Sequence, residues 1–288
     1  MSDHLLRITS TDGTLRAMAA VTTDLCEVAR QLQQTDPTAT VALARVATGT
    51  ALLGALLKDD QRVALMIEAS GPLHKLHAET DSYGHVRCSV KNPIAGLPPK
   101  GDRFDVAGAI GRAGFLHVIK DLGLKAPYRS MVQLQTSEVG EDIAFYLTTS
   151  EQVPSSVALG VVLSETATIR AAGGLIVQAL PGCPDDTLDE IETRLRAMPP
   201  VSTRLLAGAT PQQLLEELFT GIPFQSHGRT PLMFRCSCSR EQVGSILNGL
   251  DQETLADMHQ RAETVSITCG YCQRRYDFPP EELPPLGD

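Results

Sequence analysis

The sequence predicts an α+β core domain, a helical linker and a small C-terminal four-cysteine zinc-binding domain. Three observations support this fold class. Residues 1–180 mix alternating apolar segments with helical apolar periods, which is typical of an α+β domain. Residues 181–228 hold two short amphipathic segments between prolines, and residues 229–288 hold four of the seven cysteines. We therefore expect domain boundaries near residues 180 and 228.

The composition indicates a folded globular chain without a nucleic-acid partner. Of the 288 residues, 42% are hydrophobic and 20% are charged, which permits a packed core and disfavours global disorder. The net charge of −9 repels nucleic-acid phosphates. Tryptophan is absent and aromatic residues make up only 4%, so we expect no binding surface of stacked aromatic rings.

No segment of the sequence predicts a membrane partner or secretion. The first residues lack the basic and apolar regions of a signal peptide. The longest apolar tract, Val41–Leu57, contains Arg45, which favours a buried helix over a membrane span. We therefore expect a cytoplasmic protein. Cytoplasmic thiols are kept reduced, so clustered cysteines there indicate metal or redox chemistry.

Strands and helices alternate irregularly in the expected core. Period-2 apolar patterns predict the strands, and apolar residues three and four apart predict the helices. The expected elements are a hairpin over 4–21, helices over 23–35 and from 41, strands over 62–69, 73–79 and 85–92, further strands to about 136, a helix over 137–153, and strands over 155–165 and 171–181.

Two amphipathic helices are expected in the linker. The first runs from about Asp186 to Met198, and the second begins at Thr210, which forms a capping box with Gln213. Neither is long enough to be stable alone, so their apolar faces must pack against another part of the chain. These faces consist of Leu188, Ile191, Leu195, Met198, Leu214, Leu215, Leu218 and Phe219.

The four C-terminal cysteines predict a zinc site. Cys236 and Cys238 are one residue apart, and Cys269 and Cys272 frame a turn between two expected strands. Structural zinc takes four thiolates in a tetrahedron, so we expect one Zn²⁺ per chain in the reduced state. A domain this small also needs a bound metal ion or a comparable cross-link to be stably folded. The spacing leaves open an iron–sulfur cluster and four buried core cysteines.

The Cys236–Ser237–Cys238 segment adds an expectation about oxidation. If it is a strand, both side chains lie on one face, with Cα atoms about 6.6 Å apart. That distance is near the upper limit for a disulfide, so a bond between the two sulfurs requires the backbone to bend. A disulfide sulfur lacks the thiolate charge that a metal needs, so oxidation is expected to expel the ion.

Loss of the ion is expected to unfold the C-terminal domain. Structural zinc contributes about 10–16 kcal/mol of apparent binding free energy, comparable with the ~5–15 kcal/mol by which whole domains are stable. If the linker helices pack against this domain, the unfolding of the domain exposes the apolar faces of the linker, which then bind other apolar surfaces. The sequence thus supports the hypothesis of a redox-controlled switch.

Several motifs resemble a known family. The segments RCSCSREQV and ITCGYCQRRYDF resemble the zinc centre of the thirty-three-kilodalton redox-regulated heat-shock chaperones (33 kDa chaperonins). EQVPSSVALGVVL and AAGGLIVQALPG resemble the core signatures of that family, and the likeness covers nearly the full length. The resemblance implies an ATP-independent holdase of the bacterial cytoplasm. Such a protein is not an enzyme, and it is inactive while reduced and zinc-bound.

The resemblance also implies how the protein is activated and what it binds. Oxidation would form the disulfides Cys236–Cys238 and Cys269–Cys272, release zinc and unfold the linker. The active homodimer would bind unfolded or misfolded client proteins, which ATP-dependent chaperones later refold. The apolar linker residues named above are the candidate client-binding residues. Cys26, Cys88 and Cys183 lie outside the motifs, and Cys183 is a candidate for competing disulfides.

Two other functions fit parts of the pattern. One is a zinc ribbon that binds nucleic acid, but residues 229–276 carry six arginines against five acidic residues, a balance of only +1. The other is a thiol–disulfide oxidoreductase. Such enzymes place Cys-x-x-Cys at a helix N-terminus, where the dipole lowers the thiol pKa, whereas here it lies between expected strands.

Overall fold

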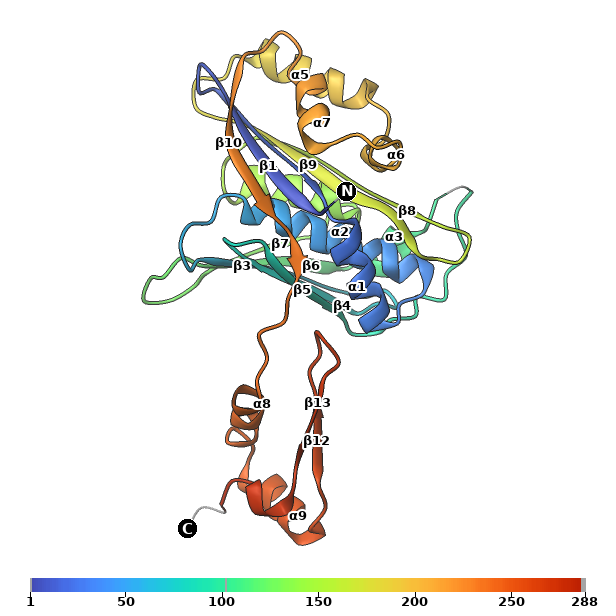
Figure 1. The fold of residues 1–288 in the computed structure, drawn as a ribbon, viewed down its shortest axis with the longest axis vertical. Coiled ribbons are helices and arrows are strands. Elements are labelled where there is room, and N and C mark those ends of the chain that lie inside the picture. The colour runs from blue at the N-terminus through green and yellow to red at the C-terminus, as the bar shows by residue number, and fades with distance from the viewer. Residues whose placement is uncertain (1, 102, 286–288) are drawn as a thin grey trace. The chain divides into compact units, whose positions relative to one another are not determined.

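The protein folds into two compact units, Met1–Arg235 and Cys236–Asp288 (Figure 1). The computed structural model describes residues 2–101 and 103–285. The predicted class is confirmed, since an α+β unit precedes a C-terminal unit that contains the cysteine cluster. The linker segment 181–228 belongs to the first unit.

Two sheets form the frame of the first unit. The expected N-terminal hairpin and the strands that follow it are confirmed. The first sheet has the order β10 (Phe224–Pro231), β1 (His4–Ser10), β2 (Leu15–Val21), β9 (Ile169–Ala179) and β8 (Ser155–Leu163). The second sheet has the order β11 (Met233–Phe234), β5 (His85–Val90), β4 (Lys75–Asp81), β3 (Arg62–Ala69), β6 (Gly114–Asp121) and β7 (Tyr128–Gln133). Neighbouring strands are antiparallel except for β11 and β5.

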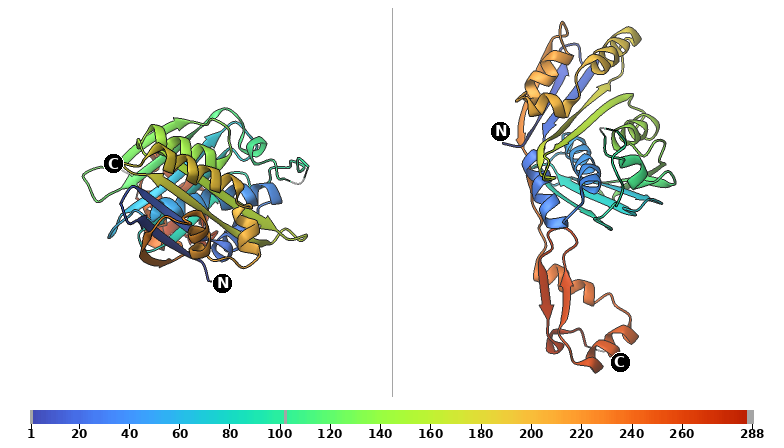
Figure 2. Two further views of the ribbon diagram at one scale, coloured as in Figure 1. Left: turned by 90° about the horizontal axis from the view of Figure 1, so that it is seen from above. Right: turned by 90° about the vertical axis from the view of Figure 1, so that its right-hand side faces the viewer.

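Helices occupy both faces of the first sheet, as Figures 1 and 2 show. One group packs between the two sheets and consists of α1 (Thr23–Gln33), α2 (Pro37–Gly54) and α4 (Val139–Thr149), with the short α3 (Val106–Ile110) against α2. The other group covers the outer face of the first sheet and consists of α5 (Asp185–Ala197), α6 (Val201–Leu206) and α7 (Pro211–Leu218).

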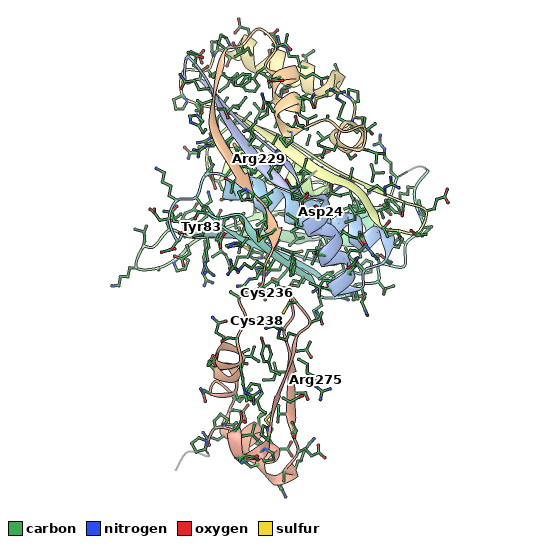
Figure 3. The ribbon with its side chains drawn as sticks, in the orientation of Figure 1. Asp24, Tyr83, Arg229, Cys236, Cys238 and Arg275 are labelled. Atoms are coloured by element: carbon green, nitrogen blue, oxygen red, sulfur yellow. The ribbon has the colours of Figure 1, made fainter. Side chains whose placement is uncertain are left out.

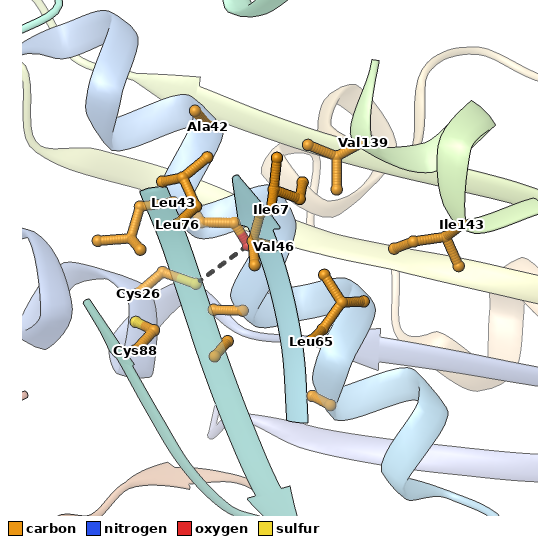
Figure 4. Packing of buried hydrophobic residues seen from close by; sticks show 14 of the residues in the cluster. Cys26, Ala42, Leu43, Val46, Leu65, Ile67, Leu76, Cys88, Val139 and Ile143 are labelled. Carbon is orange, nitrogen blue, oxygen red and sulfur yellow. Dashed lines mark hydrogen bonds between the residues drawn. The ribbon is translucent and has the colours of Figure 1, made fainter. Parts of the chain in front are cut away.

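Helix α2 lies at the centre of the first unit because small and apolar residues surround its axis. Nearly all its residues are buried, and Arg45 is the partly exposed exception within the run from Thr38 to Gly54. At Gly49 a Cβ atom would lie 2.4 Å from Cδ1 of Ile143, so glycine lets α4 pack directly on α2. Figure 4 shows this core. The interpretation of Val41–Leu57 as buried is confirmed over α2.

Across the described ranges, no helix combines the length and the apolar character that a bilayer crossing requires.

Both predicted linker helices form, and the structure adds the short α6, which was not predicted from the sequence. Helix α5 matches the expected span within one residue at each end. Thr210 and Gln213 make both hydrogen bonds of the capping box at the start of α7, with Pro211 in its first turn. The apolar faces of the helices pack on β1, β2 and β9 of the first sheet, so the sheet supplies the partner that the short helices require.

One expected strand is wrong. The segment from Pro231 through Cys238 reads as a single strand from its sequence, but β11 contains only Met233 and Phe234. Residues 235–239 have no regular structure. The inference that Cys236 and Cys238 share a strand face therefore loses its basis.

A buried carboxyl group joins three segments of the first unit. Asp3 is only 5% exposed, and its Oδ2 accepts a hydrogen bond of 2.7 Å from the backbone N–H of Leu25 in α1. Its backbone oxygen accepts another from the N–H of Leu232. Among the described residues its Oδ1 has no partner. Burial raises the pKa of Asp3 to about 6.

This pKa predicts a pH dependence of stability. The folded pKa lies above the unfolded value of 3.8, so the native state binds more protons and the free energy of unfolding falls as pH rises from 3.8 to 6. The substitution Asp3→Asn should remove this slope, a difference of about 3 kcal/mol for two pKa units. Denaturant unfolding followed by circular dichroism between pH 4 and 7 measures it, and parallel curves for the two proteins would contradict the assignment.

Candidate metal centre

Four cysteine side chains converge at two loops of the second unit. Cys236 and Cys238 lie just before α8 (Arg240–Leu247), whose N-cap Ser239 accepts a hydrogen bond from the N–H of Gln242. Cys269 and Cys272 lie in the turn between β12 (Val265–Thr268) and β13 (Arg275–Phe278). The expected C-x-x-C turn between two strands is thus confirmed, and Figure 3 marks the first two cysteines.

The backbone shapes this turn. The N–H of Cys269 donates to the oxygen of Arg274 at 2.9 Å, and the N–H of Gln273 donates back to the oxygen of Cys269 at 2.9 Å. Gln273 adopts a left-handed conformation with φ of 58°. These two bonds close the end of the hairpin that carries Cys269 and Cys272.

The distances between the sulfurs fit a tetrahedral metal site. The Sγ atoms of Cys236 and Cys269 are 3.7 Å apart, and those of Cys238 and Cys272 are 3.4 Å apart. All four lie within 4.8 Å of one another. Four bonds of about 2.3 Å to one zinc ion would place the sulfurs about 3.8 Å apart. The cluster therefore has the size that a single tetrahedral ion requires.

The ionisation of the thiols also suits a cation. Burial raises the pKa of Cys236, and it raises that of Cys272 to about 12. Burial acts in the same direction at Cys238, but hydrogen bonds from Tyr276 and from neighbouring thiols outweigh it and lower the pKa to about 7. One thiolate thus forms readily, whereas further negative charge beside it is costly. A divalent cation with a preference for sulfur removes that cost, so these donors fit Zn²⁺.

Tyr276 supports the cluster from β13. Its hydroxyl lies 3.2 Å from Sγ of Cys238 and donates to the backbone oxygen of the same residue at 3.1 Å. Sequence reasoning did not identify this residue. The only available signal was its place in the apolar alternation of β13, where Tyr276 and Phe278 are buried.

The second unit has a very small apolar core. Its buried members are Val243, Leu247, Tyr276, Phe278 and Leu283, and the partly buried Cys238 and Cys269 pack against them. Helix α9 (Gln252–Arg261) adds the buried Leu255, and a 3₁₀ turn, η1 (Pro280–Glu282), follows β13. Two of the four cysteines therefore pack against the apolar core of this unit.

The other three cysteines differ from the cluster in their surroundings. Cys26 and Cys88 are buried in the core between the two sheets, where burial raises both pKa values, that of Cys26 to about 12 (Figure 4). Buried thiols of this kind are unreactive. Cys183 is partly buried, and burial and nearby aspartates raise its pKa. Its small thiolate fraction argues against rapid competing disulfide exchange.

The candidate client-binding residues of the linker are covered in this structure. They lie against the outer face of the first sheet rather than on an exposed surface. The fully buried members are Ile191, Leu214, Leu215, Leu218 and Phe219, and the partly buried members are Leu195 and Met198. The side chain of Leu188 lies outside the described residues.

Comparison with known proteins gives one consistent result. Residues 3–279 match the family described as Hsp33 protein. A 33 kDa chaperonin of Syntrophotalea carbinolica is 58% identical over 99% of both chains, and one of Geobacter sulfurreducens is 46% identical over all of this chain and 96% of its own. The crystal structure of the 33 kDa chaperonin (heat shock protein 33 homolog) from Thermotoga maritima is 33% identical. It superposes with a TM-score of 0.87 over 97% of this chain and 96% of its own.

Removal of one sulfur should abolish tight metal binding. The substitution Cys238→Ser deletes the thiol with the lowered pKa, so we expect the zinc content of purified protein to fall from one ion per chain to near zero. Cys183→Ser, outside the cluster, is the matched control and should keep the metal. Zinc counted by atomic emission tests this, and a Cys238→Ser protein that retains one ion per chain would contradict the site.

Proposed function

The chain belongs to the Hsp33 family of chaperones, and from that premise we propose that it is an ATP-independent holdase controlled by the redox state of its cysteine cluster. One observation carries the proposal. Four sulfurs lie within 4.8 Å of one another in a unit with very few buried apolar residues, while the apolar faces of the linker are covered. The protein is proposed to bind unfolded client proteins without catalysing a reaction.

In the reduced state, Cys236, Cys238, Cys269 and Cys272 would hold one Zn²⁺ as thiolates. The ion supplies positive charge that stabilises four adjacent sulfurs, and it joins the two loops of the unit. Its binding free energy then becomes folding free energy of the second unit. In this state the linker residues remain packed on the first sheet and unavailable to clients.

Oxidation would end this arrangement. A peroxide accepts two electrons from a pair of cysteine thiolates, one S–S bond forms, the O–O bond breaks, and two water molecules leave after taking up two protons from the solvent. Two such steps consume all four donors, so the ion is released. By family resemblance the pairs are Cys236–Cys238 and Cys269–Cys272. Short distances also join Cys236 to Cys269 and Cys238 to Cys272 across the two loops, so peptide mapping of the oxidised protein must decide between the pairings.

Release of the linker would then expose its apolar faces. The residues that become available are those of α5 and α7 that now lie against the first sheet. The active form is proposed to be a homodimer in the bacterial cytoplasm that passes its clients to ATP-dependent chaperones. The Cys-x-x-Cys turn lies between two strands rather than at a helix N-terminus, so an oxidoreductase is a weaker candidate.

Oxidant should switch the activity on. We expect the reduced, zinc-loaded protein to leave thermal aggregation of citrate synthase unchanged, and the peroxide-treated protein to suppress it with loss of one zinc per chain. Light scattering and a zinc-sensitive dye, read on the same sample, measure both effects. Equal protection by the reduced, metal-loaded protein would refute the redox control.

A substitution that weakens the packing of the linker helices on the first sheet should partly activate the protein without oxidant. Leu175 in β9 faces the linker helices, whereas its neighbour Ile176 faces the core between the sheets. Both are fully buried, so substitution by alanine costs each about 2–5 kcal/mol. We expect Leu175→Ala, but not Ile176→Ala, to suppress aggregation without oxidant, although the linker sequence is unchanged. Equal activity of the two variants would show that general destabilisation, not linker release, is responsible.

A further inference from the structure

One sheet edge in the first unit lacks the usual protection against strand pairing. Strand β8 is the last strand of the first sheet, and its nine residues SSVALGVVL include no charged residue and no proline. The opposite edge, β10, carries Arg229 and Pro231, and the edge strand β7 of the second sheet carries Arg129. Charges and prolines are the means by which edge strands avoid pairing, so β8 is suited to accept a further strand.

The free backbone groups of β8 can be identified. The carbonyl oxygen of Ala158 lies 2.7 Å from where a Cβ of Gly174 in β9 would be, so Ala158 faces β9. Backbone groups alternate along a strand, so Val157, Leu159 and Val161 direct their N–H and C=O groups to the open edge. Helix α4 packs beside β8, and its Gly140 lies near the oxygen of Val157. Within the described residues β9 is the sole strand that pairs with β8.

A groove runs along this edge. Its volume is about 610 Å³, and it is lined by β8 from Val157 to Leu163. Residues of α2 and α4 form one wall, and residues 200–203 at the start of α6 form the other. The strand side chains that face the core between the sheets, among them Leu159 and Val161, are only partly buried. An added strand would therefore find apolar contacts beside unpaired backbone groups.

The charges of the groove are balanced. Arg45 and Glu138 form an ion pair in one wall, and Arg103 and Glu141 supply one further charge of each sign. The strand itself is uncharged. A segment with a large net charge of either sign thus gains nothing here, whereas an uncharged apolar segment matches the groove.

We propose that the free edge of β8 binds an extended, uncharged, apolar segment of an unfolded protein by strand addition. The segment pairs with the outward N–H and C=O groups of Leu159 and Val161 and extends the first sheet by one strand. This site rests on the proposed holdase function. It adds a second client-binding site, at the sheet edge of the first unit, which is separate from the linker surface. Because the edge is open in this structure, a short extended peptide can bind it in both redox states, whereas holding an unfolding protein also requires the linker surface, which becomes available only after oxidation.

A labelled peptide tests the site on the full-length chain. The probe is a fluorescein-labelled heptapeptide of alternating threonine and valine, compared with the same peptide methylated at every backbone nitrogen. Fluorescence anisotropy should show binding of the first peptide to both redox forms and loss of binding of the methylated one, which cannot donate hydrogen bonds. Equal or tighter binding of the methylated peptide would overturn the proposal, since adsorption to an apolar surface does not need N–H groups.

Variants locate the contact. Val161→Lys places a charge at the edge and should weaken peptide binding by about tenfold, whereas Met131→Lys on the exposed edge strand β7 should not change it. Should Val161→Lys lose its native circular dichroism, Val161→Pro removes the outward N–H without removing a bond to β9 and must show the same loss. Unchanged affinity of a folded Val161 variant overturns the site.

Two further outcomes are decisive. If the Val161 variant turns a dimer into a monomer in sedimentation while no peptide binds the parent, the edge pairs two copies of this chain and the proposal is wrong. If the peptide binds at the edge and the protein suppresses aggregation equally with and without oxidant, the strand-addition site is supported and the redox control is rejected. The two hypotheses therefore fail separately.

Discussion

Four cysteine sulfurs within 4.8 Å of one another are the constraint on which the second unit depends, because in the proposed function metal–sulfur and sulfur–sulfur bonds compete for them. A thiolate that enters a disulfide loses the charge that held the ion. Most domains stay folded when they lose one bound metal ion, because a large apolar core remains. Here only a few buried side chains remain beside the cluster, and two of the four cysteines pack among them. The cysteines that are proposed to sense the oxidant thus also pack in the core, so a chemical change at the sulfurs is expected to affect the fold.

The first unit has the opposite character. It buries an extensive core between two sheets, with α2 at its centre, and none of that core requires a metal. The linker occupies an intermediate position, since its helices are too short to be stable alone and depend on a separate apolar cluster on the outer face of the first sheet. Its surface ion pairs, such as Arg194–Glu190, contribute little to stability. Because the core of the first unit does not depend on the linker helices, the linker could leave the first sheet and expose its apolar faces while the first unit stays folded.

Local patterns were sufficient to predict the class of fold and the donor set. Apolar periodicity identified the linker helices, and the spacing of Cys236, Cys238, Cys269 and Cys272 identified the cluster. Features that depend on distant contacts were missed. The segment around Cys236 looks like a strand, but its pairing with β5 ends at Phe234 because the chain there leaves the second sheet. The bond from Tyr276 to Cys238 and the packing of the linker on β9 likewise join residues that no local pattern connects.

The two apolar surfaces that we propose for client binding differ in what protects them. The linker faces are protected by burial, which would be lost if the linker left the sheet. The edge of β8 is protected by its surroundings: it lies within a groove between α4 and α6, so that a narrow, extended chain can reach it while a folded protein, whose own strand edges are blunted, meets the walls first. An unfolded chain is the one partner that presents both unpaired backbone groups and apolar side chains. Under the proposal, the selectivity of the edge for the unfolded state follows from the shape of the edge itself.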